Sequence, residues 1–450
     1  MDNRTPFINV FGAGLAGCEA AYAAARLGVR VKLYEMKPVK YTPAHKSPDF
    51  AELVCSNSLR SDSVTNAVGL LKEEMRRLGS VTMKAAEISR VPAGSALAVD
   101  RNIFSSYITR TIRENPLIEV ISEEVSSVPD GEITVVATGP LTSDAMADYI
   151  AGSLGCRGLH FFDAAAPIVD GQTVNTEIAF YASRYGKGDA DYLNCPMKRE
   201  EYDAFYDALI GARTAELHGF DAEAQKNPEV FEGCMPVEIM AQRGRDTLRF
   251  GPLKPVGLED PRHPGREYYA VVQLRKENTE GTMFNLVGFQ THLAFPEQKR
   301  VFRMIPGLEN AEFLRYGVMH RNTYLDSPGL LNADYSMRSR PDVFFAGQMT
   351  GVEGYVESAG SGLVAGIAAA RRALGLGPVA FPESMMLGAM GAYVSRGSIG
   401  PEFAPMNANF GIIQPLPSRV KGGKTAKYQA YADRSLSETE NIVGMIGFEK

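Results

Sequence analysis

Two of the five cysteines stand in polar segments of the kind that support thiol chemistry. Cys55 lies in Leu-Val-Cys-Ser-Asn-Ser-Leu-Arg (residues 53–60), where hydroxyl and amide groups surround the sulfur and Arg60 would favour a thiolate. Cys234 lies in a predicted Gly-Cys-Met-Pro loop (residues 233–236) with carboxylates nearby. A thiolate that attacks C6 of a uracil makes C5 enolate-like and able to accept a one-carbon unit. Most isolated cysteines are small buried side chains, and three fit that role: Cys18, Cys156 and Cys195.

A dinucleotide-binding pattern opens the chain. An apolar strand runs into Gly12-Ala13-Gly14-Leu15-Ala16-Gly17, which begins an alanine-rich helix predicted over residues 18–27. Gly12 permits the tight turn, Gly14 lets a pyrophosphate approach the backbone, and Gly17 lets the helix pack on the strand. A second predicted strand, residues 29–34, ends at Glu35, where an acidic side chain is expected to bind a ribose hydroxyl.

Two later segments favour FAD over a nicotinamide cofactor. A strand near 133–137 ends in Thr138-Gly139, and a buried strand at 343–346 runs into Gly347-Gln348, followed by a small-residue helix through Gly362 to Leu374. A nicotinamide domain usually completes one nucleotide-binding sheet before the chain moves on. Here three distant segments must meet in one discontinuous α/β domain, which resembles the Rossmann-like FAD-binding domain of the glutathione-reductase type. Many relatives of that type carry an acid where this chain has Gln348.

The remaining organisation fits a soluble multidomain protein. We expect residues 1–190 and 301–450 to form the FAD-binding domain with a C-terminal tail, and residues 191–300 to form an inserted α+β domain. Helices are predicted at 66–78 and 100–113, and in the tail at 384–395, 424–433 and about 437–446. No apolar run is long enough to span a membrane, no cluster has metal-ligand spacing, and the cysteine pattern points to a reducing, cytoplasmic setting.

Several polar residues are candidates for substrate contacts. Asn57 and Arg60 flank Cys55, and His292, His320 and Tyr324 stand in segments that could stack on or hydrogen-bond to a flat heterocycle. A net charge of −6 argues against a generally basic surface but not against local patches. A basic stretch follows Cys234, and a smaller basic group lies near the C-terminus; their candidate residues are Arg243, Arg245 and Arg249, and Lys421, Lys424 and Lys427. Solvated charged faces are the ordinary alternative for both.

Taken together, these motifs resemble one family along nearly the whole chain. The glycine turn at 12–17, Cys-Ser-Asn-Ser at 55–58, Gly-Cys-Met-Pro at 233–236 and Gly-Gln-Met-Thr-Gly-Val-Glu-Gly-Tyr at 347–355 are similar to those of the folate- and FAD-dependent tRNA (uracil-5-)-methyltransferases. The cysteine segments are the most specific part of the likeness. The resemblance implies that methylenetetrahydrofolate donates a methylene group to C5 of uridine 54 in the tRNA T-loop. It also implies that reduced FAD supplies hydride and that NAD(P)H, with no domain of its own, regenerates the flavin.

The resemblance implies catalytic roles for Cys55 and Cys234. We expect Cys234 to attack C6, and Cys55 to act on the flavin side or to remove the C5 proton, although the two roles could be exchanged. One alternative is the related flavin- and folate-using wobble-uridine enzyme, which works with a GTPase and has a longer chain. Others are an NAD(P)H–flavin oxidoreductase that does not act on RNA, and a flavoprotein that binds RNA without turnover. We expect tRNA as partner, and neither a membrane nor an obligate protein partner.

Overall fold

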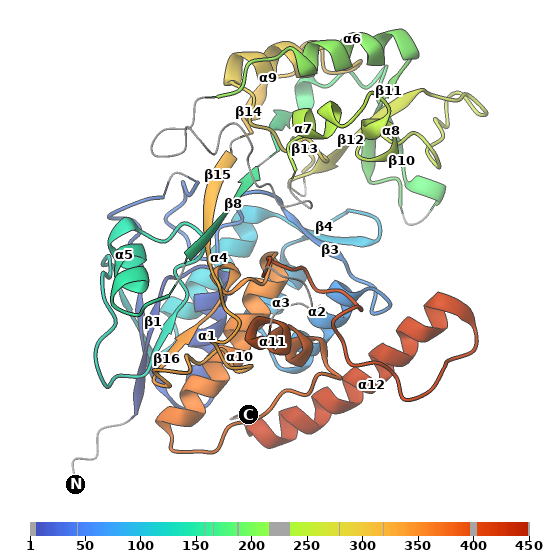
Figure 1. Cartoon of the computed structure of the whole chain (residues 1–450). Coiled ribbons are helices and arrows are strands. Elements are labelled where there is room, and N and C mark those ends of the chain that lie inside the picture. The colour runs from blue at the N-terminus through green and yellow to red at the C-terminus, as the bar shows by residue number, and fades with distance from the viewer. Residues whose placement is uncertain are drawn as a thin grey trace.

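The computed structural model describes residues 6–42, 44–156, 158–164, 166–186, 189–215, 235–278, 280–317, 319–396 and 403–448; for 158–164 and 319–323 it describes the backbone alone. The described residues form two large hydrophobic cores. The two parts of the chain that they belong to lie in the lower and the upper half of Figure 1. The larger core draws on residues from Ile8 to Cys156 and again from Leu325 to Ile446. The smaller core draws on residues from Val169 to Ala311. The chain therefore leaves the first domain, builds a second, and returns.

The first domain is organised by a parallel sheet of five strands in the order β16-β7-β1-β2-β6. Its strands are β1 (Phe7–Phe11), β2 (Arg30–Tyr34), β6 (Ile118–Ile121), β7 (Thr134–Val136) and β16 (Val343–Phe345). The central strand β1 pairs with β2 on one side and with β7 on the other, and β7 pairs with β16. Strands from three distant parts of the chain thus meet, which confirms the predicted discontinuous α/β domain.

Helices and a small sheet complete this domain. Its helices are α1 (Leu15–Ala25), α2 (Ala67–Arg77), α3 (Val81–Ile88), α4 (Arg101–Arg113), α5 (Asp144–Gly152), α10 (Tyr355–Ala373), α11 (Met386–Arg396) and α12 (Gly423–Ile446). A three-stranded sheet holds β3 (Ser58–Ser61), β4 (Arg90–Val91) and β5 (Ala96–Val99). Helices α1 and α10 pack backbone against backbone, because Cβ atoms at Gly362 and Gly366 would lie 2.1 and 2.5 Å from atoms of α1.

The second domain is built on a six-stranded sheet in the order β10-β11-β12-β13-β9-β14. Its strands are β9 (Ile168–Asp170), β10 (Phe180–Ala182), β11 (Tyr192–Met197), β12 (Ala270–Lys276), β13 (Met283–Leu286) and β14 (Phe313–Arg315); its helices are α6 (Arg199–Ile210), α7 (Val237–Gln242), α8 (Thr247–Phe250) and α9 (Phe295–Phe302). The domain is therefore α+β, as predicted. The insertion is longer at both ends than residues 191–300, because β9, β10 and β14 belong to its sheet.

An antiparallel pair of strands, β8 (Gly158–Ala164) and β15 (Met319–Leu325), forms the connection between the domains. Short 3-10 turns lie at Gly171–Thr173, Arg184–Gly186 and Gln348–Thr350. The tail differs from the sequence prediction, since the two expected pieces form one helix, α12. Ser435, which lies between those pieces, is fully buried and donates a hydrogen bond to Glu74 of α2, so tertiary contact satisfies a residue that would otherwise weaken a helix. None of the described helices is both long and apolar enough to cross a membrane.

Candidate active site

A cavity of about 520 Å³ opens at the carboxyl ends of the parallel strands. It is lined by residues that directly follow β1, β2, β7 and β16, including Gly12, Glu35, Thr138 and Gly347. Carboxyl ends of parallel strands share one edge of a sheet, which is where open α/β domains bind ligands. Residues of the second domain, Arg275 and Gln290, also line it, so the cavity reaches the junction between the domains.

The glycine turn has the geometry that a pyrophosphate needs. Gly12 has φ +91°, and a Cβ there would lie 2.6 Å from the carbonyl oxygen of Ala137. A Cβ on Gly17 would lie 1.8 Å from the carbonyl oxygen of Gly12, so only glycine allows the helix this close to the turn. Gly14 is different: nothing lies within 4 Å of its Cβ position, and the residue lines the cavity. Helix α1 begins directly after Gly14, three residues earlier than predicted, which brings its unpaired first amides to the cavity.

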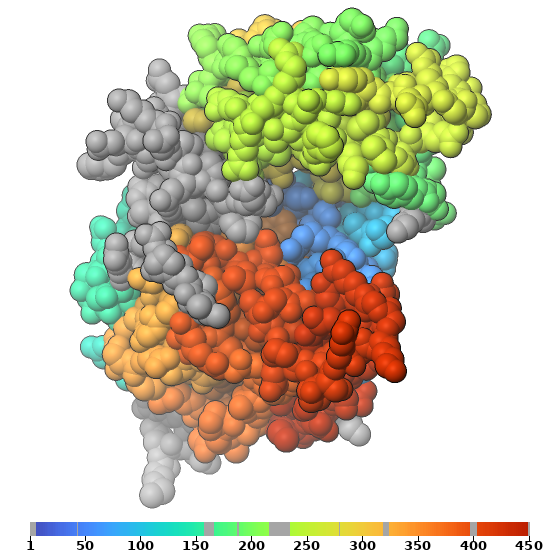
Figure 2. Space-filling view, turned by 45° about the vertical axis from the view of Figure 1, so that its right-hand side comes forward, coloured from blue at the N-terminus to red at the C-terminus, as the bar shows by residue number. Residues whose placement is uncertain are grey.

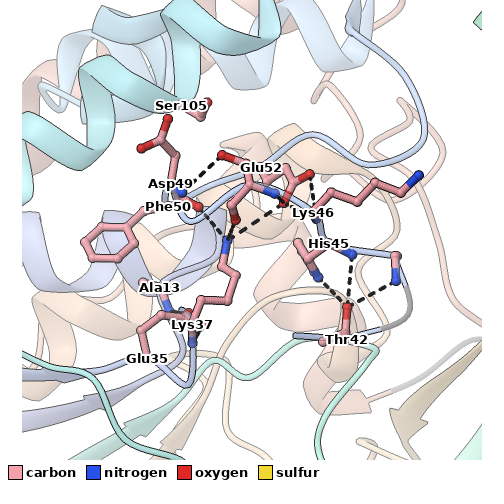
Figure 3. A network of polar contacts seen from close by, with 12 residues as sticks. Ala13, Glu35, Lys37, Thr42, His45, Lys46, Asp49, Phe50, Glu52 and Ser105 are labelled. Atoms are coloured by element: carbon pink, nitrogen blue, oxygen red, sulfur yellow. Dashed lines mark hydrogen bonds and ion pairs between the residues drawn. The ribbon is translucent and has the colours of Figure 1, made fainter. Parts of the chain in front are cut away.

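Glu35 shapes the turn as well as facing the cavity (Figure 3). One carboxylate oxygen accepts a hydrogen bond from the Ala13 amide at 2.7 Å, and the other accepts one from the Lys37 amide at 3.0 Å. The side chain is largely buried. The acid expected to bind a ribose therefore already accepts hydrogen bonds from the backbone after β1 and after β2, and it lines the cavity with acceptor capacity to spare.

The loop that follows β2 is folded on its own polar contacts (Figure 3). Lys37 is buried and donates hydrogen bonds to the carbonyl oxygens of Ser47 and Asp49, at 3.1 and 2.5 Å. The Thr42 hydroxyl lies 2.6 Å from Nδ1 of His45. Glu52 accepts hydrogen bonds from the amides of residues 46 and 47. No residue of this loop was predicted to belong to the site, although Lys37, Thr42, His45 and Glu52 all line the cavity.

The predicted residues after β7 and β16 separate into two groups. Thr138, Gly139, Gly347 and Gln348 line the cavity. The side-chain amide of Gln348 donates a hydrogen bond to the Glu353 carboxylate at 2.5 Å. The backbone amide of Gly347 donates one to the Ser361 hydroxyl at 2.7 Å. Gly362 instead lies against α1 and is absent from the cavity wall, so its small size serves helix packing.

Cys55 lies on the cavity wall beside Tyr355, the first residue of α10. The tyrosine oxygen lies 2.9 Å from Sγ of Cys55 and accepts a hydrogen bond from the Cys55 amide at 2.7 Å. Burial and the nearby charge of Cys55 raise the pKa of Tyr355 well above its usual value, so the hydroxyl keeps its proton. Tyr355 ends the Gly347–Tyr355 motif, but its position in the sequence did not indicate a contact with Cys55.

The Cys55 segment is held at the contact between the two domains. Arg275 of β12 donates hydrogen bonds at 2.9 Å to Asn57 and to the Ser56 hydroxyl. The Asn57 amide donates to the carbonyl oxygens of Val99 and Lys276, at 3.1 and 2.9 Å. Asn57 is fully buried and absent from the cavity wall, so the structure gives it a joining role where the sequence predicted a substrate contact. Arg275 was missed, although an arginine at the end of an apolar strand is a usable signal.

Arg60 and Arg101 fix the surroundings of Cys55. Arg60 has φ +62°, lines the cavity and pairs with Glu357, which is fully buried in α10. Arg101 donates a hydrogen bond to the Leu53 carbonyl oxygen at 2.7 Å and forms an ion pair with Glu277 of the second domain, also at 2.7 Å. Burial acts to lower the pKa of Arg101, but the charge of Glu277 and the hydrogen bond to it outweigh burial, and the pKa is raised.

Two of the predicted aromatic and histidine contacts, His292 and Tyr324, lie outside the cavity wall. The pKa of His292 is lowered by burial, and its backbone amide donates a hydrogen bond to the buried Glu238 at 2.6 Å. Tyr324 is buried and packs near Phe403. His320 lies in β15, and its side chain is outside the described part of the chain.

The basic stretch of the second domain is largely paired with acids. Arg245 forms ion pairs with Asp203 and Asp207, at 2.7 and 2.5 Å. Arg249 pairs with Asp246 at 2.7 Å and stacks on Tyr269 at 3.6 Å. Arg243 is exposed at the end of α7.

Of the other thiols, Cys18, Cys156 and Cys195 are buried, and burial raises the pKa of each. Cys234 lies outside the described residues. Within the described ranges, no group of three or more His, Cys, Asp or Glu could hold a metal ion.

Comparisons with known proteins decide the family. A family model described as "Glucose inhibited division protein A" matches residues 7–377. The methylenetetrahydrofolate--tRNA-(uracil-5-)-methyltransferase TrmFO of Acetivibrio thermocellus is 59% identical over 437 residues, covering 97% of this chain and 98% of the relative. The protein of the same name from Halalkalibacterium halodurans is 56% identical over 439 residues, covering 98% and 99%. The chain belongs to the TrmFO family.

A solved structure extends the TrmFO comparison to the fold. Aquifex aeolicus GidA in its form II crystal superposes with a TM-score of 0.70 at 17% identity, covering 98% of this chain and 74% of that chain. This likeness confirms the α/β fold class. It carries no statement about substrate.

Proposed function

We propose that this TrmFO-family protein is a FAD- and folate-dependent enzyme that methylates C5 of uridine 54 in the tRNA T-loop. The names of its full-length relatives at 56–59% identity specify methylenetetrahydrofolate, tRNA and position 5 of uracil. The observation that carries the proposal within the chain is the place of Cys55, on the wall of the same cavity that holds the dinucleotide turn. A thiol and a dinucleotide site in one cavity suit a reaction that combines carbon transfer with reduction.

The residues of the cavity fit FAD. The open space at Gly14 and the first amides of α1 suit a pyrophosphate. Glu35 lines the cavity after β2, where its carboxylate would accept a hydrogen bond from a ribose hydroxyl. Gly347 and Gln348 line the part of the wall that follows β16, where the resemblance expects the ribityl chain. When bound, FAD supplies the two electrons that convert carbon at the formaldehyde level into a methyl group. NAD(P)H as the source of those electrons is also part of the proposal.

The chain's own groups supply the remaining steps. We assign to Cys234 the attack on C6 of uracil, which forms an S–C6 bond that breaks again on product release. The described chain resumes at Met235, and the Val237 amide donates a hydrogen bond at 2.7 Å to the carbonyl oxygen of Gln290, a residue on the cavity wall. We assign to Cys55 the removal of the C5 proton. The Tyr355 hydroxyl lies 2.9 Å from the Cys55 sulfur and would hold it in position. Such a tRNA substrate is consistent with the predicted cytoplasmic location.

A labelling experiment tests the proposal. The FAD-loaded protein is incubated with unmodified tRNA transcript, methylene-labelled methylenetetrahydrofolate and NADH or NADPH, and label is located by nuclease digestion and mass spectrometry. We expect label at C5 of uridine 54, and none in a transcript that carries cytidine there. Cys234→Ala and Cys55→Ala should each abolish transfer while retaining the flavin absorbance. Absence of label from the flavin-loaded protein would overturn the proposal, and label at the wobble uridine would favour the alternative enzyme.

A further inference from the structure

The C-terminal segment carries an unusual charge distribution. Residues 403–432 contain no aspartate or glutamate, whereas the whole chain has 53 acids and a net charge of −6. Four cations fall in the last part of this segment, at Arg419, Lys421, Lys424 and Lys427, and all four are exposed. They occupy the loop before α12 and its first turns. This basic segment, residues 419–427, is therefore a local positive surface on an acidic protein.

The cations of the basic segment have no acidic partners in the part of the chain that the structure describes. The arginines of the second domain behave differently, since Arg245 and Arg249 are held by nearby aspartates. A cation already paired with a carboxylate contributes less to the attraction of a second anion than an unpaired one does. The cations of the basic segment are therefore more available to a phosphate than Arg245 and Arg249 are.

Aromatic stacking fixes the shape of this surface. The Phe410 ring stacks on Tyr428 with centroids 4.3 Å apart, and on Tyr431 at 5.5 Å. The ammonium groups of Lys424 and Lys427 lie over these same tyrosine rings, at 5.5 and 5.6 Å. The loop around Phe410 therefore packs against α12, and Lys424 and Lys427 lie on that packed surface.

The basic segment continues from the wall of the cavity. Asn407 lines the cavity and donates a hydrogen bond at 2.7 Å to the carbonyl oxygen of Glu353, and the Ala408 amide donates one to Glu357 at 2.8 Å. Arg419 follows Asn407 by twelve residues. Figure 2 shows the orange-red C-terminal segment forming one side of a hollow, with the second domain opposite and blue N-terminal residues at its floor. The segment that carries the four cations thus belongs to the same stretch of chain that contributes Asn407 to the cavity wall.

We propose that the basic segment binds phosphates of the tRNA while its target base occupies the cavity. This inference rests on the proposed function and names the surface through which the RNA is held. RNA fits better than a membrane, because a peripheral helix needs an apolar anchor as well as cations. Among the described residues of 403–432, no large hydrophobic side chain is exposed.

Removing Lys424 and Lys427 tests the inference. The variant Lys424→Ala/Lys427→Ala is compared with the wild type and with Lys299→Ala/Arg300→Ala, which removes two exposed cations from α9 of the second domain. Binding of unmodified tRNA transcript to the FAD-loaded full chain is measured over a salt series by fluorescence anisotropy. Each phosphate contact contributes roughly 0.7–0.9 to the slope of log K against log salt, so the lysine variant should lose about 1.5 of that slope. At about 0.15 M salt its affinity should fall about twentyfold.

The outcomes separate this inference from the proposed function. A lower slope in the lysine variant alone, with KM for tRNA raised and kcat at saturating tRNA retained, would support the basic segment as the RNA surface. Equal slopes in the lysine variant and the α9 control would overturn it, even if both enzymes methylate uridine 54. A wild-type protein that binds tRNA but transfers no label would contradict the proposed function alone. Lysine-dependent binding to phosphatidylglycerol vesicles, without lysine-dependent tRNA binding, would assign the segment to a membrane and overturn the inference.

Discussion

Replacing Tyr355 by phenylalanine should impair Cys55 while leaving the dinucleotide turn intact. The tyrosine oxygen accepts a hydrogen bond from the Cys55 amide at 2.7 Å and lies 2.9 Å from the sulfur. Because the oxygen accepts from the amide, its own proton is available to the sulfur. The raised pKa of Tyr355 keeps that proton in place at neutral pH. The hydroxyl is therefore placed to donate a hydrogen bond to the Cys55 sulfur, and a bond of that kind stabilises negative charge on the acceptor.

The size of the effect follows from the loss of one hydrogen bond to a charged group. Such bonds contribute roughly 1.5–3 kcal/mol, which corresponds to about a ten- to hundredfold lower thiolate population at a given pH. The Cys55 amide also loses its acceptor, which should cost about 1–3 kcal/mol of unfolding free energy. The phenylalanine variant should thus fold less stably and react more slowly.

Alkylation of Cys55 by iodoacetamide at neutral pH, followed peptide by peptide with mass spectrometry, measures the thiolate directly. The flavin content of the proteins is matched by absorbance before the comparison. The control is Tyr393→Phe, which also loses a partly buried tyrosine hydrogen bond, from its hydroxyl to the Ala404 carbonyl oxygen at 2.5 Å, away from Cys55. We expect slower alkylation only in Tyr355→Phe. An unchanged rate and pH profile in that variant would refute the role given to the hydroxyl.

Three further predictions follow from the same structure. Gly17→Ala should lower the melting temperature and the flavin absorbance, because the new Cβ would lie 1.8 Å from a backbone oxygen. A bulky residue at Gly14, where the Cβ position is open, should leave the melting temperature unchanged and reduce only the flavin absorbance. Asn57→Ala should lower the unfolding free energy by about 2–4 kcal/mol in urea titrations, since buried partners in both domains lose their bonds, and no change would contradict the joining role. Burial raises the pKa of Glu74 from 4.5 to about 7, so the native state binds more protons between these values and stability should fall as pH rises through that window, by up to about 3 kcal/mol. Denaturation of Glu74→Gln over the same pH range should lack this slope.

The sequence was most informative where a local pattern and a short-range steric demand coincide. The turn at 12–17 could be predicted because a strand, a close backbone approach and a helix start all depend on neighbouring residues. The discontinuous first domain followed from three such strand ends, which parallel pairing must bring to one edge. The cysteine segments could be singled out because thiols among hydroxyl and amide groups have a limited set of uses.

Sequence patterns were less informative where a residue's contacts depend on a distant partner. Asn57 looked like a substrate ligand, but its bonds run to Val99 and to β12, which only the folded chain brings together. Gly362 looked like a cofactor residue, but its missing side chain accommodates α1. The tail helix was divided at a serine that Glu74, 361 residues earlier, satisfies. Each of these contacts joins residues far apart in the sequence, so the local pattern of apolar and polar residues does not indicate it.

The sequence by itself determined the cofactor class, the two candidate thiols and the family, since these depend on residue type and short spacing. Tertiary structure alone decided that Tyr355 touches Cys55 from 300 residues away and that Arg275 of the second domain holds the same segment. It also decided which cations remain available for phosphate, because ion pairs form between side chains whose proximity the fold creates. Charge can be counted along a chain, but pairing is a property of three-dimensional distance.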